Sequence, residues 1–161
     1  MEALQAHGIE RLADVRRFPA SRRHPQFDRE ALAAALAERG IAYRWFEALG
    51  GRRRPDPDSP NRGIRVEGFR GYADYMRTAE FAAAFEALVE WMRHGPIAIL
   101  CAERLWWQCH RRLLSDLLVA RGATVRHILD AGRAAEHSLW ELAEVTEDGI
   151  VYPPPQSELG L

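Results

Sequence analysis

The sequence contains no lysine and only two cysteines, although it has 161 residues and 22 basic side chains, all of them arginine. Two cysteines are too few for the disulfide framework of a small secreted domain. The first residues have neither the basic start nor the apolar stretch of a signal peptide, and no apolar run is long enough to span a bilayer. We therefore expect a cytoplasmic protein without a membrane partner, in which Cys101 and Cys109 are reduced.

Because the chain has no lysine, its arginines are weaker evidence for phosphate binding than arginines usually are. When every basic residue is an arginine, a coding bias explains it as readily as a phosphate-binding fork does. The charges are nevertheless uneven: residues 11–77 carry 15 arginines and nine acidic residues, whereas residues 78–161 carry seven arginines and 12 acidic residues. A basic half in a chain of net charge −1 favours a polyanionic ligand.

Length and composition predict one globular domain. A chain of 161 residues, 47% hydrophobic and 28% charged, is long enough to bury a core. We place this domain at residues 1–152, followed by a proline-rich tail at 153–161.

Helical and strand patterns alternate along the chain. Asp28 and Thr78 are suited to begin helices, and Gly8, Gly40 and Gly122 to end them. Helices are predicted over 2–7, 29–39, 79–93 and 109–121, strands over 12–15, 41–46, 97–100 and 124–129, a long loop over 48–70, and a hairpin turn at Asp148-Gly149. The strand at 97–100 is an unbroken apolar run, which is typical of a strand buried on both faces.

This order predicts an α/β fold with an open, mostly parallel sheet, flanking helices and a small C-terminal hairpin. Ligands of such sheets bind beyond the carboxyl ends of the strands. The polar residues that follow three of the predicted strands are expected to meet there: Asp14, Arg16 and Ser21; Gly50, Gly51 and Arg52; and Cys101, Glu103, Cys109, His110 and Arg111.

Among these residues, Cys109 is the preferred nucleophile. At the start of a helix and close to Arg111, its thiolate would be stabilised. Cys101, Glu103 and Asp14 are the other catalytic candidates, although a buried cysteine also serves as a small apolar residue. His110 is a poor partner for Cys109, because adjacent residues on a helix point about 100° apart.

Asp14 and Arg16 lie two residues apart on a strand and share one face. Arg16 then binds an anion that Asp14 positions, or the two belong to internal ion pairs with Arg111 or Glu103. A zinc site formed by Cys101, Cys109, His110 and His24 is disfavoured by the spacing, so we expect no metal. The sequence contains no Walker loop and identifies no cofactor.

Three classes of function fit these patterns. The first, which we favour, is an anion-binding domain that acts on a nucleotide or another phosphorylated ligand through Arg16, Ser21, Gly50, Gly51, Arg52, His110 and Arg111. The second is a nucleic-acid-binding module in which Trp106, Trp107 and Tyr72 stack on bases. The third is an interaction domain without chemistry, which gives no reason for reactive residues to gather at one sheet edge.

The segments LADVRRFPASRRHPQF, GIAYRWFEALGGRRRP and CAERLWWQCHRR resemble the bacterial and archaeal family catalogued as domain of unknown function 488. The resemblance implies an α/β fold in which DVR-x-x-P-x-S and C-x-E…CHR are the matched motifs. It implies no particular reaction. Members of the family usually begin with a Thr-Ile-Gly-His-Ser strand, which has no counterpart here, so we expect an unpaired sheet edge and self-association.

Overall fold

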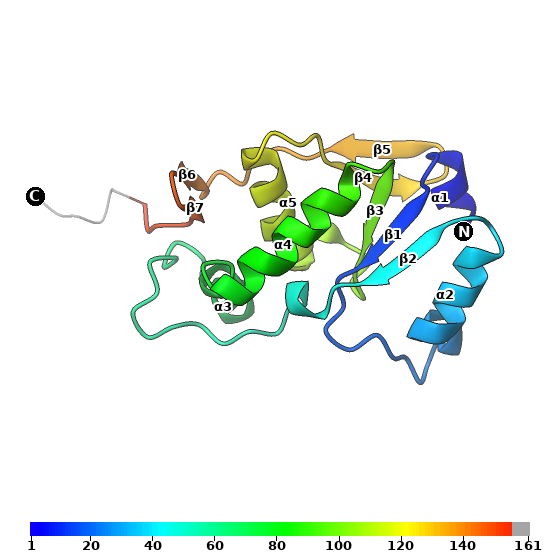
Figure 1. The fold of residues 1–161 in the computed structure, drawn as a ribbon. Coiled ribbons are helices and arrows are strands. Elements are labelled where there is room, and N and C mark those ends of the chain that lie inside the picture. The colour runs from blue at the N-terminus through cyan, green and yellow to red at the C-terminus, as the bar shows by residue number, and fades with distance from the viewer. Residues whose placement is uncertain (156–161) are drawn as a thin grey trace, which may run out of the picture.

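A computed structural model of the chain describes residues 1–155 and has a three-stranded parallel sheet at its centre (Figure 1). The strands are β1 (Arg11–Asp14), β2 (Ala42–Trp45) and β3 (Ile97–Leu100), in the order β2-β1-β3. In register, Asp14 lies beside Trp45 of β2 and Leu100 of β3. The three carboxyl ends therefore meet at one edge, as the alternation of helices and strands predicts.

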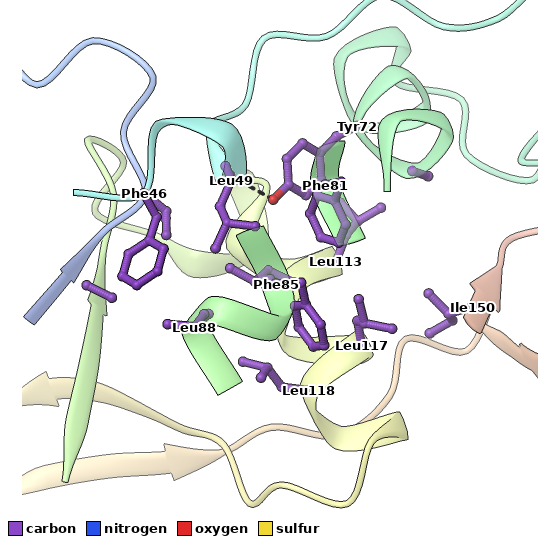
Figure 2. Close-up of a cluster of buried hydrophobic side chains, with 14 of the residues drawn as sticks. Phe46, Leu49, Tyr72, Phe81, Phe85, Leu88, Leu113, Leu117, Leu118 and Ile150 are labelled. Atoms are coloured by element: carbon purple, nitrogen blue, oxygen red, sulfur yellow. Dashed lines mark hydrogen bonds between the residues drawn. The ribbon is translucent and has the colours of Figure 1, made fainter. Parts of the chain in front are cut away.

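Helices cover both faces of this sheet because apolar residues point to both sides of β1. Leu12 packs with Leu32 and Leu36 of α2 (Arg29–Ala37), whereas Ala13 belongs to the larger cluster on the opposite face. Figure 2 shows part of that larger cluster, including Phe81, Phe85 and Leu88 of α4 (Ala79–Met92) and Leu113, Leu117 and Leu118 of α5 (Arg111–Ala120). The predicted α/β class is confirmed.

Most predicted helix ends are confirmed. The short helix α1 (Glu2–Ala6) is followed by Gly8, whose φ of 65° suits glycine. The Thr78 hydroxyl accepts a hydrogen bond from the Phe81 N–H at the start of α4. Asp28 precedes α2 as predicted, but its carboxylate accepts the N–H of Ser21 rather than one from its own helix.

The fourth predicted strand does not join the parallel sheet, and that part of the prediction is wrong. β4 (Arg126–Asp130) pairs antiparallel with β5 (Arg133–Glu136) in a separate two-stranded sheet. A tight turn produces this antiparallel pairing: the Asp130 carboxylate accepts the N–H of Gly132 and binds the guanidinium of Arg133.

Two further predictions need correction. Every residue of β3 is partly exposed, because β3 is an edge strand and not a strand buried on both faces. The predicted loop at 48–70 overlaps the end of the short 3-10 helix η2 (Glu47–Leu49) and the first part of α3 (Glu67–Tyr75). Gly71 of α3 allows close packing, since a Cβ there would lie 2.2 Å from the Arg53 carbonyl oxygen.

The predicted C-terminal hairpin is confirmed as β6 (Glu144–Thr146) and β7 (Gly149–Val151), with Glu147 and Asp148 between the strands. Of the predicted tail, 153–155 follows β7 directly, and 156–161 lie outside the described residues. Within residues 1–155, no helix combines the length and the apolar character that a membrane span requires.

Candidate functional site

The carboxyl edge of the sheet holds a thiol cluster, by which we mean Cys101, Cys109 and His110. Cys101 directly follows β3. The 3-10 helix η3 (Trp106–Gln108) then leads to Cys109, and His110 stands immediately before α5. The cluster is therefore built from a strand end and a helix start, nine residues apart, that the parallel sheet brings together.

The two sulfur atoms lie 2.9 Å apart and both cysteines are free. The Nδ1 atom of His110 lies 3.6 Å from the sulfur of Cys109 and 3.7 Å from that of Cys101. The other ring nitrogen, Nε2, is 3.1 Å from the carbonyl oxygen of Val15. A carbonyl oxygen only accepts hydrogen bonds, so Nε2 carries a proton, and Nδ1 is the ring nitrogen that faces both sulfurs.

This geometry corrects the expectation that Cys109 and His110 point apart. That expectation assumed that both residues lie on a helix, whereas Cys109 has extended dihedral angles, φ −132° and ψ 153°, and α5 begins only at Arg111. The bend between an extended residue and a helix start turns the imidazole back towards the thiol. A Cys–His contact between adjacent residues is thereby possible.

The environment favours a thiolate on Cys109. A hydrogen bond from the Cys101 thiol is the main cause that lowers the pKa of Cys109, burial opposes it, and His110 and the backbone N–H of Arg111 lower it further. The same hydrogen bond, together with burial, raises the pKa of Cys101. The two thiols therefore titrate as a coupled pair, in which the surroundings favour the negative charge on Cys109.

The cysteine whose pKa is lowered is the less accessible of the two. Cys109 is only 2% exposed, whereas Cys101 is partly exposed. An incoming molecule meets the sulfur of Cys101 first. The sequence-based preference for Cys109 as the nucleophile considered charge and not accessibility.

The loop after β2 packs against the thiol cluster because it carries two glycines. A Cβ on Gly51 would lie 2.8 Å from Nδ1 of His110, and one on Gly50 would lie 2.7 Å from the backbone of Arg17. The ring of Tyr72 from α3 also packs against His110, with ring centroids 4.8 Å apart. Both the Gly51 backbone and the Tyr72 ring therefore limit where the imidazole can lie.

Several arginines surround this edge. Arg17 donates a hydrogen bond to the carbonyl oxygen of Arg52, and Arg52 has a φ of 60°, which is rare for a residue with a side chain. Arg111 donates to the carbonyl oxygen of Glu103 and leaves its buried Nε without a partner. The Glu103 side chain is exposed. In the described part of the chain, no carboxylate forms an ion pair with Arg17, Arg52 or Arg111.

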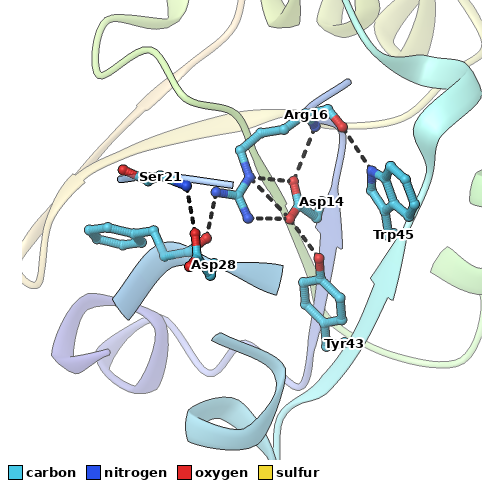
Figure 3. Close-up of polar contacts among 7 residues, drawn as sticks. Asp14, Arg16, Ser21, Asp28, Tyr43 and Trp45 are labelled. Atoms are coloured by element: carbon cyan, nitrogen blue, oxygen red, sulfur yellow. Dashed lines mark hydrogen bonds and ion pairs between the residues drawn. The ribbon is translucent and has the colours of Figure 1, made fainter. Parts of the chain in front are cut away.

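Asp14 and Arg16 form an internal ion pair, with Nη2 of Arg16 2.6 Å from Oδ2 of Asp14 (Figure 3). Arg16 also donates to the Phe27 carbonyl oxygen, and the Tyr43 hydroxyl donates to Asp14. Although burial lowers it, hydrogen bonding to Asp14 and its charge raise the pKa of Arg16 overall. This pair resembles the predicted internal alternative, but the partners are each other rather than Arg111 or Glu103.

The pair faces α2, away from the thiol cluster. Asp14 shares a face of β1 with Leu12, which packs against α2, and Arg16 reaches Phe27 in the 3-10 helix η1 (Pro25–Phe27). Ser21 lies on this side too, hydrogen-bonded to Asp28 and His24. Arg16 and Ser21 are therefore not gathered with the thiols, whereas Gly51, Cys101, Cys109 and His110 are.

The ligand atoms of Cys101, Cys109 and His110 all lie within 4.8 Å of one another and could hold a metal ion. His24 is not part of this group. Two thiolates on one tetrahedral zinc stand roughly 3.8 Å apart, as Zn–S bonds of about 2.3 Å require. The observed 2.9 Å is shorter than this, so the sulfurs would have to separate to bind zinc.

Sequence reasoning missed a second polar network, which is centred on Asp116 of α5. Asp116 is fully buried and accepts hydrogen bonds from His137, Tyr152 and the backbone N–H of Trp140. His137 in turn contacts His127, with 2.9 Å between their ring nitrogens. Burial is the main cause that lowers the pKa of His127 to about 4, and His137 and Arg111 add to it.

The aromatic residues proposed for base stacking are engaged elsewhere. The Trp106 ring stacks on His127 with centroids 3.9 Å apart and planes within 1° of parallel. Tyr72 is fully buried and donates to the carbonyl oxygen of Leu49. Trp107 alone of the three is exposed.

Replacing Gly51 by alanine tests how His110 is positioned. The new Cβ would collide with Nδ1, displace the imidazole and raise the apparent pKa of the thiol pair by about one unit. The measurement is the rate of alkylation by iodoacetamide as a function of pH. Gly68→Ala is the matched control, since a Cβ there meets nothing within 4 Å. An unchanged pH profile in Gly51→Ala would show that His110 does not tune the thiols.

Comparison with known proteins gives one match. The model of a family described as domain of unknown function DUF488 matches residues 1–118. That range includes the thiol cluster and both glycines that pack against this edge, and it confirms the resemblance predicted from the motifs. No curated protein and no solved structure matches the chain.

Proposed function

This chain belongs to the family catalogued as domain of unknown function 488, and we propose that it is a thiol-dependent enzyme acting on an anionic, phosphorylated ligand such as a nucleotide. The observation that carries the proposal is the thiol pair, 2.9 Å between sulfurs, with a histidine ring nitrogen directed at both. A pair used only for packing would need neither the histidine nor a lowered pKa.

Cys101 is the nucleophile in this proposal and Cys109 is its base. The accessible Cys101 sulfur meets the electrophilic atom of the ligand while its proton passes to the Cys109 thiolate. His110 supports this transfer, because its Nδ1 lies within 3.7 Å of both sulfurs and stabilises the charge on the Cys109 thiolate before attack. The new bond joins Cys101 to the ligand, and the ligand's leaving group departs with its electron pair.

The anionic character of the ligand is inferred from the charges around the thiols. Arg111 adjoins the cluster, and Arg17 and Arg52 follow β1 and β2 at the same edge of the sheet. None of the three has an acidic partner among residues 1–155, and α5 starts at this edge with its N-terminal N–H groups. A phosphate group would complement these donors. In this proposal Arg16 does not bind the phosphate, because Asp14 already neutralises its charge.

Alkylation of the cysteines tests the nucleophile. Iodoacetamide is expected to modify Cys101 first and to react almost as fast at pH 6 as at pH 8. An ordinary thiol, with a pKa of about 8.5, would slow roughly 80-fold over that range. Cys109→Ser should restore the ordinary pH dependence at Cys101, and Cys101→Ser should leave Cys109 nearly unreactive because it is buried. Preferential labelling of Cys109 would contradict this assignment.

Protection from alkylation tests the ligand. Inorganic phosphate and AMP are expected to slow the modification of Cys101, whereas uncharged adenosine is not. Arg52→Gln should weaken this protection, and Arg22→Gln, a change of the same kind at an exposed arginine outside the cluster, should not. Protection by a single-stranded oligonucleotide but not by AMP would favour the nucleic-acid alternative. Protection by none of them would contradict the anionic ligand.

A further inference from the structure

The sulfur atoms of Cys101 and Cys109 lie close to the separation of a disulfide bond, although both cysteines are free. They are 2.9 Å apart, and a disulfide holds its sulfurs about 2.05 Å apart. The two atoms therefore need to approach by less than roughly 1 Å to be joined. These are the only two cysteines of the chain, so within one molecule neither has another thiol to pair with.

The segment between the two cysteines is a loop that tolerates a shift of this size. Residues 102–108 contain neither an α-helix nor a strand, only the short η3, and most of them are exposed. Cys101 itself lies beyond the last residue of β3 and outside the parallel pairing. A small movement of this loop is therefore enough to join the sulfurs while β3 and α5 stay in place.

The two thiols differ in the way that a reversible oxidation requires. Cys101 is partly exposed, so an oxidant in solution reaches it first, whereas Cys109 is buried. The Cys101 thiol, His110 and the backbone N–H of Arg111 all lower the pKa of Cys109, so this second sulfur is ready to attack as a thiolate. An accessible cysteine with a second thiolate beside it is typical of cysteines that are oxidised reversibly.

From this geometry we propose that Cys101 and Cys109 form a reversible redox site, in which a peroxide joins them in an intramolecular disulfide and so switches off the nucleophile Cys101. A thiol reductant restores both thiols. Formation of the disulfide does not depend on any ligand. Its effect as a switch rests on the proposed function, because only there is Cys101 the nucleophile.

The oxidation takes place in two steps. Cys101 first passes its proton to Cys109 and attacks one oxygen of hydrogen peroxide. An S–O bond forms, the O–O bond breaks, and the departing hydroxide takes the proton of Cys109 to become water. The Cys109 thiolate then attacks the sulfur of the Cys101 sulfenic acid, so the S–S bond forms and the S–O bond breaks with release of hydroxide. The two sulfurs lose two electrons in total, and the peroxide gains them.

The second cysteine also decides whether the oxidation can be reversed. A sulfenic acid that meets no thiol is oxidised further to a sulfinic acid, which a thiol reductant does not restore. Because Cys109 lies within 2.9 Å, it captures the sulfenic acid of Cys101 before a second peroxide arrives. The pair therefore keeps an exposed nucleophile recoverable.

Mild oxidation of the whole chain tests the proposal. After treatment with an equimolar amount of hydrogen peroxide, the intact mass should fall by that of two hydrogen atoms. Peptide mapping without reductant should find residues 101 and 109 linked within one chain. Iodoacetamide should then no longer modify Cys101, and dithiothreitol should restore its alkylation completely.

Two variants assign the roles of the sulfurs. In Cys109→Ser, oxidised at about pH 9 where an ordinary thiol is ionised, Cys101 should accumulate as a sulfenic acid that dimedone traps, and excess peroxide should inactivate it irreversibly. In Cys101→Ser, the buried Cys109 should hardly react with peroxide. Circular dichroism checks that both variants keep the fold, and the experiment on the unmodified chain is decisive without them.

Two outcomes on the unmodified chain would overturn the proposal. One is a sulfenic or sulfinic acid that accumulates on Cys101 without a link to Cys109, and the other is a disulfide between two copies of the chain in its place. Neither result alters the alkylation of the reduced protein or its protection by phosphate, which test the proposed function separately. A disulfide between 101 and 109 in a chain that phosphate does not protect would support the redox site and contradict only the anionic ligand.

Discussion

Asp116→Ala is expected to lower the free energy of unfolding by about 3–5 kcal/mol, because it leaves three buried donors without an acceptor. The carboxylate joins α5 to Trp140, His137 and Tyr152 of the C-terminal region. Loss of the network should therefore loosen the C-terminal segment before the parallel sheet. Urea unfolding followed by tryptophan fluorescence and by circular dichroism measures both effects.

Two smaller substitutions show whether the loss of stability comes from the Asp116 network or from substitution in general. Tyr152→Phe removes only the hydroxyl that donates to Asp116 and should cost about 1–2 kcal/mol. Asp148→Ala makes the same chemical change at an exposed position, and its effect should stay within about 0.5 kcal/mol. If Asp116→Ala proved as mild as Asp148→Ala, the buried carboxylate would not hold the C-terminal region in place.

The position of the site was predictable because topology alone sets it. Parallel strands bring their carboxyl ends to one edge, so Cys101, Gly51 and the start of α5 had to meet whatever their side chains do. The internal arrangement was not predictable, because it depends on where α5 begins. A start two residues after Cys109 leaves that residue extended and turns His110 towards the sulfurs.

The sequence left two roles open for Asp14 and Arg16, for a related reason. The sequence correctly places them on one face of β1, but it does not say which helix covers that face. Leu12 packs against α2, so the side chain of Asp14 also points there and pairs with Arg16. Only the three-dimensional packing separates this face from the face of the thiols.

One feature of the sequence around Asp116 points to the buried network, although the helical periodicity of apolar residues does not show it. Six consecutive residues of α5, from Leu113 to Leu118, are buried, and the helix is therefore covered on nearly all sides. An aspartate inside such a run must find partners, and distant His137 and Tyr152 supply them. Separations of 21 and 36 residues carry no local pattern that would identify the partners.

The Asp14–Arg16 pair leads to the second prediction with a large effect. Asp14→Ala should cost about 3–5 kcal/mol of unfolding free energy, because it leaves the guanidinium of Arg16 buried without a counter-charge. The double variant Asp14→Leu and Arg16→Met replaces both charges by apolar groups of similar size. It should recover most of the loss, since a buried ion pair contributes little beyond what an apolar pair contributes.

The same variants decide between a structural and a ligand-binding role. If the pair is structural, the double variant keeps the alkylation profile of Cys101 and its protection by phosphate, because the pair lies on the α2 face and the thiols do not. If Arg16 binds the ligand, as the sequence suggested, protection is lost while the fold remains stable. Unfolding in urea and protection by phosphate, measured on the same samples, therefore separate the two roles. The free energy of unfolding depends on whether the buried charges of Asp14 and Arg16 balance. Protection of Cys101 depends on the arginines at the thiol face.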